Sequence, residues 1–256
     1  MSFNFTDILP QTKLSYEYLP GSSPGIVYLN GFYSTMMGLK ASTLQKFCQK
    51  QGHQFLRFDY RGHGLSDGCI EKLSIKEWLE DTLFLLDYIT KGTQILVGSS
   101  MGAWIMILAT LLRPQKIVAN IGISAAPDFP VKLILPSLSL DQKISLEKNH
   151  CFDFFSPYSL KPYKISKYFL DQSKDFVILK SSNSNFNLAS LSQPFTLFHG
   201  LNDQEVPWEL SLEILNQISN HENKLIMFKD GNHRLSEQHH LDALINEVKK
   251  LIHKFS

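Results

Sequence analysis

The stretch GSSMGAW, residues 98–104, places Ser100 between two glycines in a Gly-x-Ser-x-Gly pattern. This spacing can hold a serine on a sharp strand-to-helix turn, where its hydroxyl is exposed for nucleophilic attack. Serine is also a favoured helix N-cap, so the pattern alone leaves both roles open. The flanking residues favour the nucleophile, because QILV before the turn is typical of a buried strand and MGAWIMILATLL after it of a helix.

A serine hydroxyl is a weak nucleophile unless a base removes its proton and an acid orients that base. Asp203 in HGLNDQEVPW and His233 in KDGNHRLSE each follow an apolar, strand-like run. Taken singly, Asp203 can be a turn residue and His233 an exposed loop residue. Together with Ser100 they give the chain order Ser, Asp, His, which is that of one class of hydrolase. Asp128 is the second candidate for the acid, and Asp230 a weaker one because it is too close in sequence to His233.

An oxyanion formed at Ser100 needs two backbone donors. We expect them at Met101, directly after the nucleophile, and at Phe32 in LNGFYS, where Gly31 lets the backbone approach a substrate. Other histidines are weaker candidates, since we expect His63 in a loop and His199 as the last residue of its strand. We expect five more at the surface: His53, His150, His221, His239 and His240.

The Gly-rich run DYRGHGLSDG, residues 59–68, lacks the lysine of a phosphate-binding loop and the spacing of a dinucleotide fingerprint. We interpret it as a turn whose Asp and Arg tie neighbouring loops together. No His or Cys cluster has metal-ligand spacing, so we expect no metal, and the predicted chemistry needs no cofactor.

Six apolar runs are typical of buried parallel strands: 25–30, 54–60, 94–98, 118–125, 194–200 and 224–230. The more alternating run 13–19 predicts an antiparallel edge strand. Helical patterns lie between them, at 42–51, 74–90, 101–112, 208–220 and 237–255. In the second of these, Ser74 is the expected N-cap with Glu77 three residues on. This alternation predicts an α/β protein with a mostly parallel central sheet and helices on both faces.

The regular alternation stops between residues 127 and 193, where DFVILK is the one strand-like run. The segment is too long for an ordinary loop, so we expect a cap inserted into a single domain of residues 1–256. Aromatic residues gather in it, either as its own small core or as the lining of a site, among them Phe129, Phe152, Phe154, Phe155, Tyr158, Tyr163, Tyr168 and Phe169.

Composition indicates a soluble globular protein, with 43% hydrophobic and 19% charged residues and a formal net charge of +1. A chain so nearly neutral is not expected to bind nucleic acid. The three cysteines are widely spaced, which favours a reducing compartment. The uncharged stretch 92–112 is long enough to cross a bilayer, but its first half is too polar, so we expect no integral membrane segment. The N-terminus shows no signal or transit pattern, and we expect a cytoplasmic location.

GSSMG, HGLNDQEVP, GNHR and DYRGHGLSDG together resemble the α/β-hydrolase superfamily over essentially the whole chain. Within it, the runs 29–68 and 95–122 and HGLNDQEVPW are most similar to the palmitoyl-protein thioesterases, also described as acyl-glucuronide esterases, of the α/β-hydrolase-domain group. That resemblance implies an α/β-hydrolase fold, a triad of Ser100, Asp203 and His233, and S-acylated proteins or small acyl esters as substrates. It is weak across the cap.

The sequence therefore predicts a serine hydrolase that cleaves a carboxylic thioester or ester through an acyl-enzyme. A general carboxylesterase for small acyl esters or acyl-glucuronides shares the same residues, as does a perhydrolase that uses peroxide. A non-catalytic binding protein with the same fold is a further alternative. The oligomeric state is left open by the sequence.

Overall fold

The computed structural model describes residues 3–9, 12–179 and 186–256. Its main sheet has eight strands: β1 (Asn4–Leu9), β2 (Thr12–Leu19), β3 (Ser22–Leu29), β4 (His53–Phe58), β5 (Gln94–Ser99), β6 (Ile117–Ile123), β9 (Phe195–Gly200) and β10 (Lys224–Phe228). They lie in the order β1-β2-β4-β3-β5-β6-β9-β10, with β1 and β2 antiparallel to their neighbours and the other ladders parallel. The mostly parallel α/β sheet predicted from the sequence is confirmed.

The antiparallel start of the sheet differs from the sequence prediction in one respect. The run 13–19 is antiparallel as expected, but it is not an edge strand, because β1 pairs with its outer side through Phe5 and Ser15, among other residues. The segment NFTDIL of β1 was not predicted, since it is too polar and mostly exposed to show a core-facing pattern. An outer strand gains much of its stability from its backbone ladder, which its side chains do not reveal.

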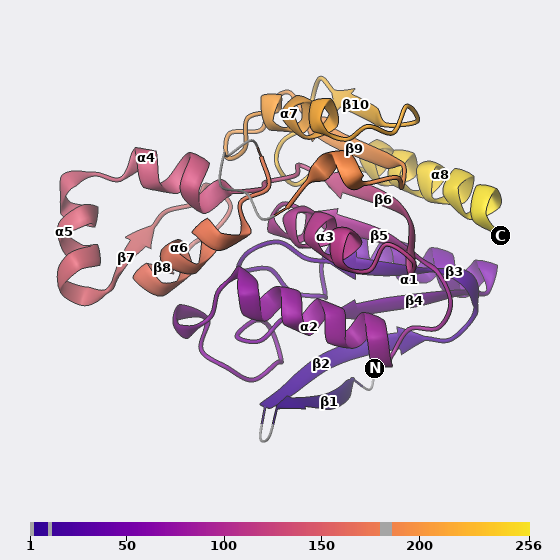
Figure 1. Ribbon diagram of the computed structural model, residues 1–256, viewed down its shortest axis with the longest axis horizontal. Coiled ribbons are helices and arrows are strands. Elements are labelled where there is room, and N and C mark those ends of the chain that lie inside the picture. Colours follow the sequence, from indigo (N-terminus) through magenta and orange to yellow (C-terminus); the bar gives the residue numbers. More distant parts are fainter. Residues whose placement is uncertain (1–2, 10–11, 180–185) are drawn as a thin grey trace.

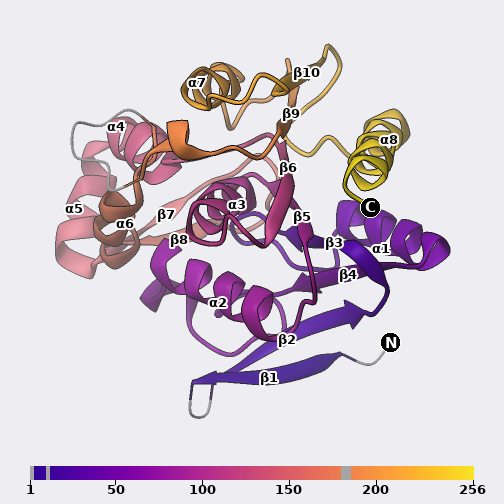
Figure 2. The same ribbon diagram turned by 45° about the vertical axis from the view of Figure 1, so that its right-hand side comes forward.

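Helices cover both faces of the sheet (Figure 2). On one face, α1 (Leu39–Gln51) and α8 (Gln238–Phe255) pack against inward residues such as Ile26 and Tyr28. On the other, α2 (Ile75–Tyr88), α3 (Met101–Leu112) and α7 (Glu209–Gln217) share a core with Val27 and Leu29. Alternate residues of one strand thus enter different cores, which is why the strands read as continuous apolar runs.

The local signals at the start of α2 act as the sequence predicts. The Ser74 hydroxyl accepts the backbone N–H of Lys76 across 3.3 Å, and the Glu77 carboxylate accepts the backbone N–H of Ser74 across 2.8 Å. These two bonds satisfy donors that have no partner inside the helix. The helix start is therefore fixed by four consecutive residues.

The described residues of the segment predicted as a cap, 127–179 and 186–193, lie beside the sheet in Figure 1 and are inserted between β6 and β9. Its elements are a π-helical turn (Pro130–Ile134), α4 (Leu135–Ser137), α5 (Leu140–Asn149), the antiparallel pair β7 (Cys151–Phe154) and β8 (Tyr163–Ser166), α6 (Lys167–Ser173), and 3-10 turns at Lys174–Phe176 and Leu188–Ser190. The run DFVILK is not a strand where it is described, because its first two residues belong to a 3-10 turn; Lys180 lies outside the described residues.

The apolar stretch 92–112 divides between β5 and α3. In the described part of the chain, no helix combines the length and the apolar character needed to cross a bilayer.

Candidate active site

Ser100 lies on the turn between β5 and α3 with a backbone φ of +55° and ψ of −120°. Side-chain-bearing residues rarely adopt this conformation, and its strain is typical of functional turns. The flanking glycines are required: a Cβ on Gly98 would lie 2.5 Å from the carbonyl oxygen of Gly102, and one on Gly102 would lie 2.2 Å from the carbonyl oxygen of Leu29. No side-chain cap bond from Ser100 to α3 forms, so its role is not that of an N-cap.

His233 comes from the loop after β10 and joins Ser100 to Asp203. Its Nδ1 is 2.7 Å from Oδ2 of Asp203, and its Nε2 is 3.1 Å from Oγ of Ser100. Because an ionised carboxylate only accepts hydrogen bonds, the ring proton sits on Nδ1, and the Nε2 lone pair faces the serine hydroxyl. Nε2 is therefore placed to take the proton of Ser100.

The Asp203 side chain is 1% exposed and is held by four donors. Its Oδ1 accepts the backbone N–H groups of Glu205 and Val206, each across 2.9 Å, and its Oδ2 accepts from His233 and from Nε2 of His199 at 3.1 Å. Burial alone would raise the pKa of Asp203, but the hydrogen bonds from His199 and His233 outweigh it and hold that pKa well below its ordinary value. Asp203 is thus ionised at neutral pH.

The two alternative acids have other partners. Asp128 is buried at the start of the segment 127–193 and accepts the backbone N–H groups of Ile178 and Leu179 at 2.8 to 3.1 Å. Burial raises the pKa of Asp128 to about 6, against the lowering effect of those two N–H groups. Asp230 is exposed and pairs with His239 across 3.0 Å. Neither carboxylate bonds His233.

The turn after β3 lies directly against Ser100. A Cβ on Gly31 would be 3.3 Å from Cβ of Ser100 and 3.9 Å from its Oγ, so the backbone of this turn lies beside the serine side chain. The backbone N–H of Ser34 bonds the carbonyl of Gly31 across 3.1 Å, and that of Tyr33 bonds Nε2 of His63 across 3.2 Å. Phe32 and Met101, predicted as oxyanion donors, therefore flank Ser100, one in this turn and one at the start of α3.

The motif DYRGHGLSDG ties loops together, as its sequence suggests. Asp59 accepts the backbone N–H of Met36 across 2.7 Å and that of Leu65 across 3.0 Å. Arg61 forms a buried ion pair with Asp81, with Nε 2.6 Å from Oδ1. The motif thereby links the loop after β3 to α2.

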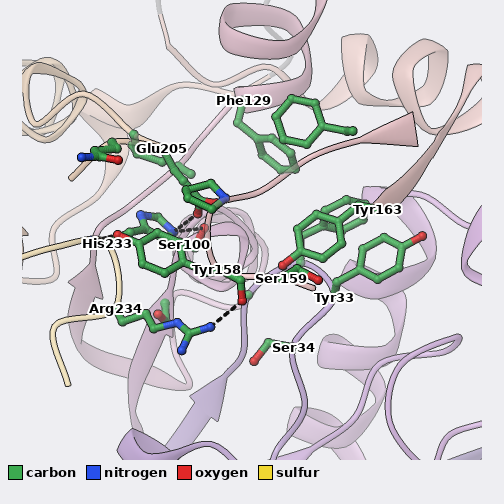
Figure 3. A pocket seen from close by; sticks show the side chains of 18 of the residues that line it. Tyr33, Ser34, Ser100, Phe129, Tyr158, Ser159, Tyr163, Glu205, His233 and Arg234 are labelled. Atoms are coloured by element: carbon green, nitrogen blue, oxygen red, sulfur yellow. Dashed lines mark hydrogen bonds and ion pairs between the residues drawn. The ribbon is translucent and has the colours of Figure 1, made fainter. Parts of the chain in front are cut away.

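A cavity of about 1010 Å³ opens over Ser100 and His233. Figure 3 shows its two unlike sides, with Phe129, Tyr33 and Tyr163 on one and Glu205, His233 and Arg234 on the other. The ring of Tyr33 stacks on that of Tyr163 with centroids 4.5 Å apart, so residues of the segment 127–193 complete the apolar side.

Sequence reasoning missed two polar residues, one beside His233 and one beside Asp203. Oε2 of Glu205 is 3.4 Å from Nε2 of His233, and His199 is fully buried, with Nδ1 2.7 Å from Oγ of Ser211. His199 is also the next-to-last residue of its strand, not the last. Glu205 lies in HGLNDQEVPW, two residues after Asp203, but sequence spacing does not show which loop side chains turn inward.

His240 was expected at the surface, and this is wrong: it is 4% exposed, because its ring packs edge-on against Phe228 with centroids 4.6 Å apart. With Asp230 and His239 it forms the one cluster in the described residues whose atoms could hold a metal ion, all within 4.8 Å. However, Nδ1 of His240 accepts the backbone N–H of Glu237 across 3.3 Å, so the neutral ring carries its proton on Nε2, facing Asp230. The cluster therefore suits a polar contact between Asp230 and the two histidines, which joins the two ends of the His233 loop, better than a metal.

The chain matches known proteins over its whole length. A family model described as serine aminopeptidase, S33, matches residues 25–148. Mouse palmitoyl-protein thioesterase ABHD10, mitochondrial, is 34% identical over 256 residues, covering 100% of this chain and 84% of that protein. The solved structure of mouse α/β-hydrolase domain-containing protein 10 superposes with a TM-score of 0.88 at 33% identity, covering 100% of both chains. A putative hydrolase from Agrobacterium vitis S4 has the same TM-score at 26% identity, covering 98% of each chain. The protein belongs to the α/β-hydrolase family, among the relatives of the palmitoyl-protein thioesterase ABHD10.

Proposed function

We propose that this protein is a serine esterase or thioesterase in which Ser100 is the nucleophile, His233 the general base and Asp203 the acid that orients it. The observation that carries the proposal is the continuous hydrogen-bonded series from Ser100 through His233 to Asp203, which opens into the cavity at Ser100. A binding protein would need neither the strained serine turn nor a fully engaged carboxylate behind the imidazole.

The reaction follows from this geometry. Oγ of Ser100 attacks the carbonyl carbon while its proton passes to Nε2 of His233, and the negative charge on the carbonyl oxygen is met by the backbone N–H groups of Phe32 and Met101. The bond to the leaving oxygen or sulfur then breaks, and Nε2 returns its proton to that atom. Water repeats the sequence on the acyl-enzyme: it gives a proton to Nε2, adds to the carbonyl carbon, and Oγ leaves and is reprotonated.

The two sides of the cavity suggest where each part of a substrate binds. The leaving atom must receive the proton from Nε2, so the leaving group lies on the side of His233. The acyl chain then extends between the oxyanion turn and the segment 127–193, which we propose acts as a cap. Phe129 and Tyr163 of that segment pack against Phe32 with ring centroids 5.8 and 6.0 Å apart. An apolar acyl group, as in an S-palmitoylated protein or a small acyl ester, suits this lining.

The proposal is tested by intact-mass measurement after incubation with a fluorophosphonate, which reports an activated serine without assuming a substrate. We expect one adduct on the wild type and none on Ser100→Ala or His233→Ala. Ser99→Ala is the matched control, because Ser99 is the neighbouring hydroxyl and also lines the cavity. An adduct that persisted in Ser100→Ala would contradict the assignment of Ser100 as the nucleophile. If folded wild-type protein formed no adduct, a non-catalytic binding protein would be favoured.

The substrate class is tested by hydrolysis rates for S-acyl peptides, acyl-CoA and p-nitrophenyl esters of rising chain length. Rates that increase with chain length support a lipid-acyl substrate. Preference for short chains instead favours a general carboxylesterase for small acyl esters or acyl-glucuronides. The cytoplasmic location expected from the sequence stays a prediction for cell fractionation, and the thioesterase relatives are named as mitochondrial.

A further inference from the structure

Glu205 is a second carboxylate at the catalytic base, on the side opposite Asp203. Its Oε2 lies 3.4 Å from Nε2 of His233, the nitrogen that is also 3.1 Å from Oγ of Ser100. Asp203, in contrast, faces Nδ1 at the far edge of the ring. The Glu205 side chain is 23% exposed and lines the cavity. Its charge therefore acts on whatever approaches Nε2.

The Glu205 carboxylate is fixed in this place by the segment 127–193. The hydroxyl of Ser156 donates to Oε1 of Glu205, and Ser156 itself is 7% exposed. The same hydroxyl oxygen accepts the backbone N–H of Tyr158 across 3.2 Å. One carboxylate oxygen is thus occupied, while the other faces His233.

The positive side chains along the cavity do not neutralise Glu205 by direct contact. Nζ of Lys40 donates to the carbonyl of Arg234 across 2.5 Å, and the guanidinium of Arg234 donates to the carbonyl of Tyr158 across 2.7 Å. Lys161 also lines the cavity and is exposed to solvent. Among the described residues lining the cavity, Glu205 is the one carboxylate, and it lies close enough to His233 to pair with Nε2 when that nitrogen carries a proton.

We propose that Glu205 determines leaving-group specificity: it favours esters and thioesters whose leaving group carries a positive charge or a hydrogen-bond donor near the scissile atom, and it disfavours anionic leaving groups. This inference rests on the proposed function. The leaving atom must come within hydrogen-bond distance of Nε2 to be protonated, so the adjoining atoms of the leaving group pass within a few ångströms of the Glu205 carboxylate. At such a separation, charge attraction or repulsion changes the rate by on the order of tenfold.

The inference is tested with two phosphonothioates that share one phosphonyl group and differ only in the leaving thiol. One thiol is 2-(trimethylammonio)ethanethiol and the other its uncharged isostere 3,3-dimethylbutanethiol. Each reagent labels the serine once, so the ratio of their labelling rates measures leaving-group preference without a physiological substrate. We expect the wild type to favour the cationic reagent and Glu205→Gln to lower the ratio about tenfold. Glu209→Gln removes a carboxylate in the same way at the start of α7, and it should leave the ratio of the two labelling rates unchanged.

The outcomes separate the two proposals. An unchanged ratio in Glu205→Gln, with both rates altered equally, would show that Glu205 only supports the fold, and would overturn the specificity assignment while leaving the proposed function intact. Failure of both reagents to label wild-type protein would overturn the proposed function and this inference with it. Hydrolysis of thioesters made from the same two thiols should reproduce the ratio.

Discussion

The imidazole of His63 accepts the backbone N–H of Tyr33 across 3.2 Å. Nδ1 of the ring faces the carbonyl of Arg61 at 3.3 Å, and a carbonyl only accepts, so His63 is a neutral ring with its proton on Nδ1. Tyr33 has a left-handed backbone, with φ of +56°, and it follows the proposed oxyanion donor Phe32 directly. The histidine of the Gly-rich motif thus holds the turn that carries the proposed oxyanion donor Phe32.

Loss of this bond should slow catalysis without weakening substrate binding. We expect His63→Ala to lower kcat by about tenfold to a hundredfold with little change in KM, because the turn that carries an oxyanion donor loses its support. His63→Gln, whose amide oxygen can accept the same N–H, should recover part of the rate. Steady-state kinetics on folded protein provide the test, and equal rates in both variants and wild type would contradict the assigned role.

The burial of His63 also predicts a pH dependence of stability. Burial lowers the pKa of His63 from 6.5 to about 4, against the opposing effect of its bond to Arg61. Between these pH values the unfolded chain binds a proton that the folded chain does not, so stability falls as the pH drops from 6.5 to 4. The loss attributable to His63 is about 3 kcal/mol.

Urea unfolding between pH 7 and 4 measures this loss. His63→Gln cannot bind the proton in either state, so its free energy of unfolding should fall less steeply over the interval than that of the wild type. Parallel curves for the two proteins would show that other groups cause the acid sensitivity.

Replacing each of the buried aspartates Asp203 and Asp128 by asparagine should separate an effect on catalysis from an effect on stability. Asp203→Asn should reduce kcat by about ten-thousandfold, because an amide favours the wrong tautomer of His233. Asp128→Asn should retain most of the activity but lower the melting temperature, since one amide oxygen replaces two oxygens that accept the N–H groups of Ile178 and Leu179. The reverse result, with activity lost in Asp128→Asn alone, would make Asp128 the acid.

The glycine after Ser100 sets the distance between α3 and β3. A Cβ at Gly102 would lie 2.2 Å from the carbonyl oxygen of Leu29 and 2.7 Å from that of Asn30. Because both atoms belong to the backbone, Gly102→Ala should cost at least about 3 kcal/mol of stability. At Gly38 the nearest atom to an added Cβ is 3.7 Å away, so Gly38→Ala should change stability by less than about 1 kcal/mol. Chemical denaturation of both variants provides the measurement.

The sequence by itself determined the order of the main elements and singled out three candidate site residues that the fold brings together. Buried strands and amphipathic helices appear in local periodicity, and α3 begins and ends at the predicted residues 101 and 112. The role of the glycines around Ser100 can also be predicted from the sequence, because a strained turn excludes side chains at positions within a few residues of it. Asp203 and His233 could be selected because each follows a strand, and parallel strands end at a common edge of the sheet.

The tertiary structure alone decided which other side chains meet at that edge. Glu205 and His63 contact residues about thirty positions away in the chain, at His233 and Tyr33. His199 contacts Asp203 only because the loop after β9 turns back on the strand, and no sequence spacing encodes that turn. His240 is buried by Phe228, and β1 is held by its ladder to β2, although neither segment looks like a core element. Local pattern records the surroundings of a residue along the chain, whereas these contacts depend on where separate segments are packed together.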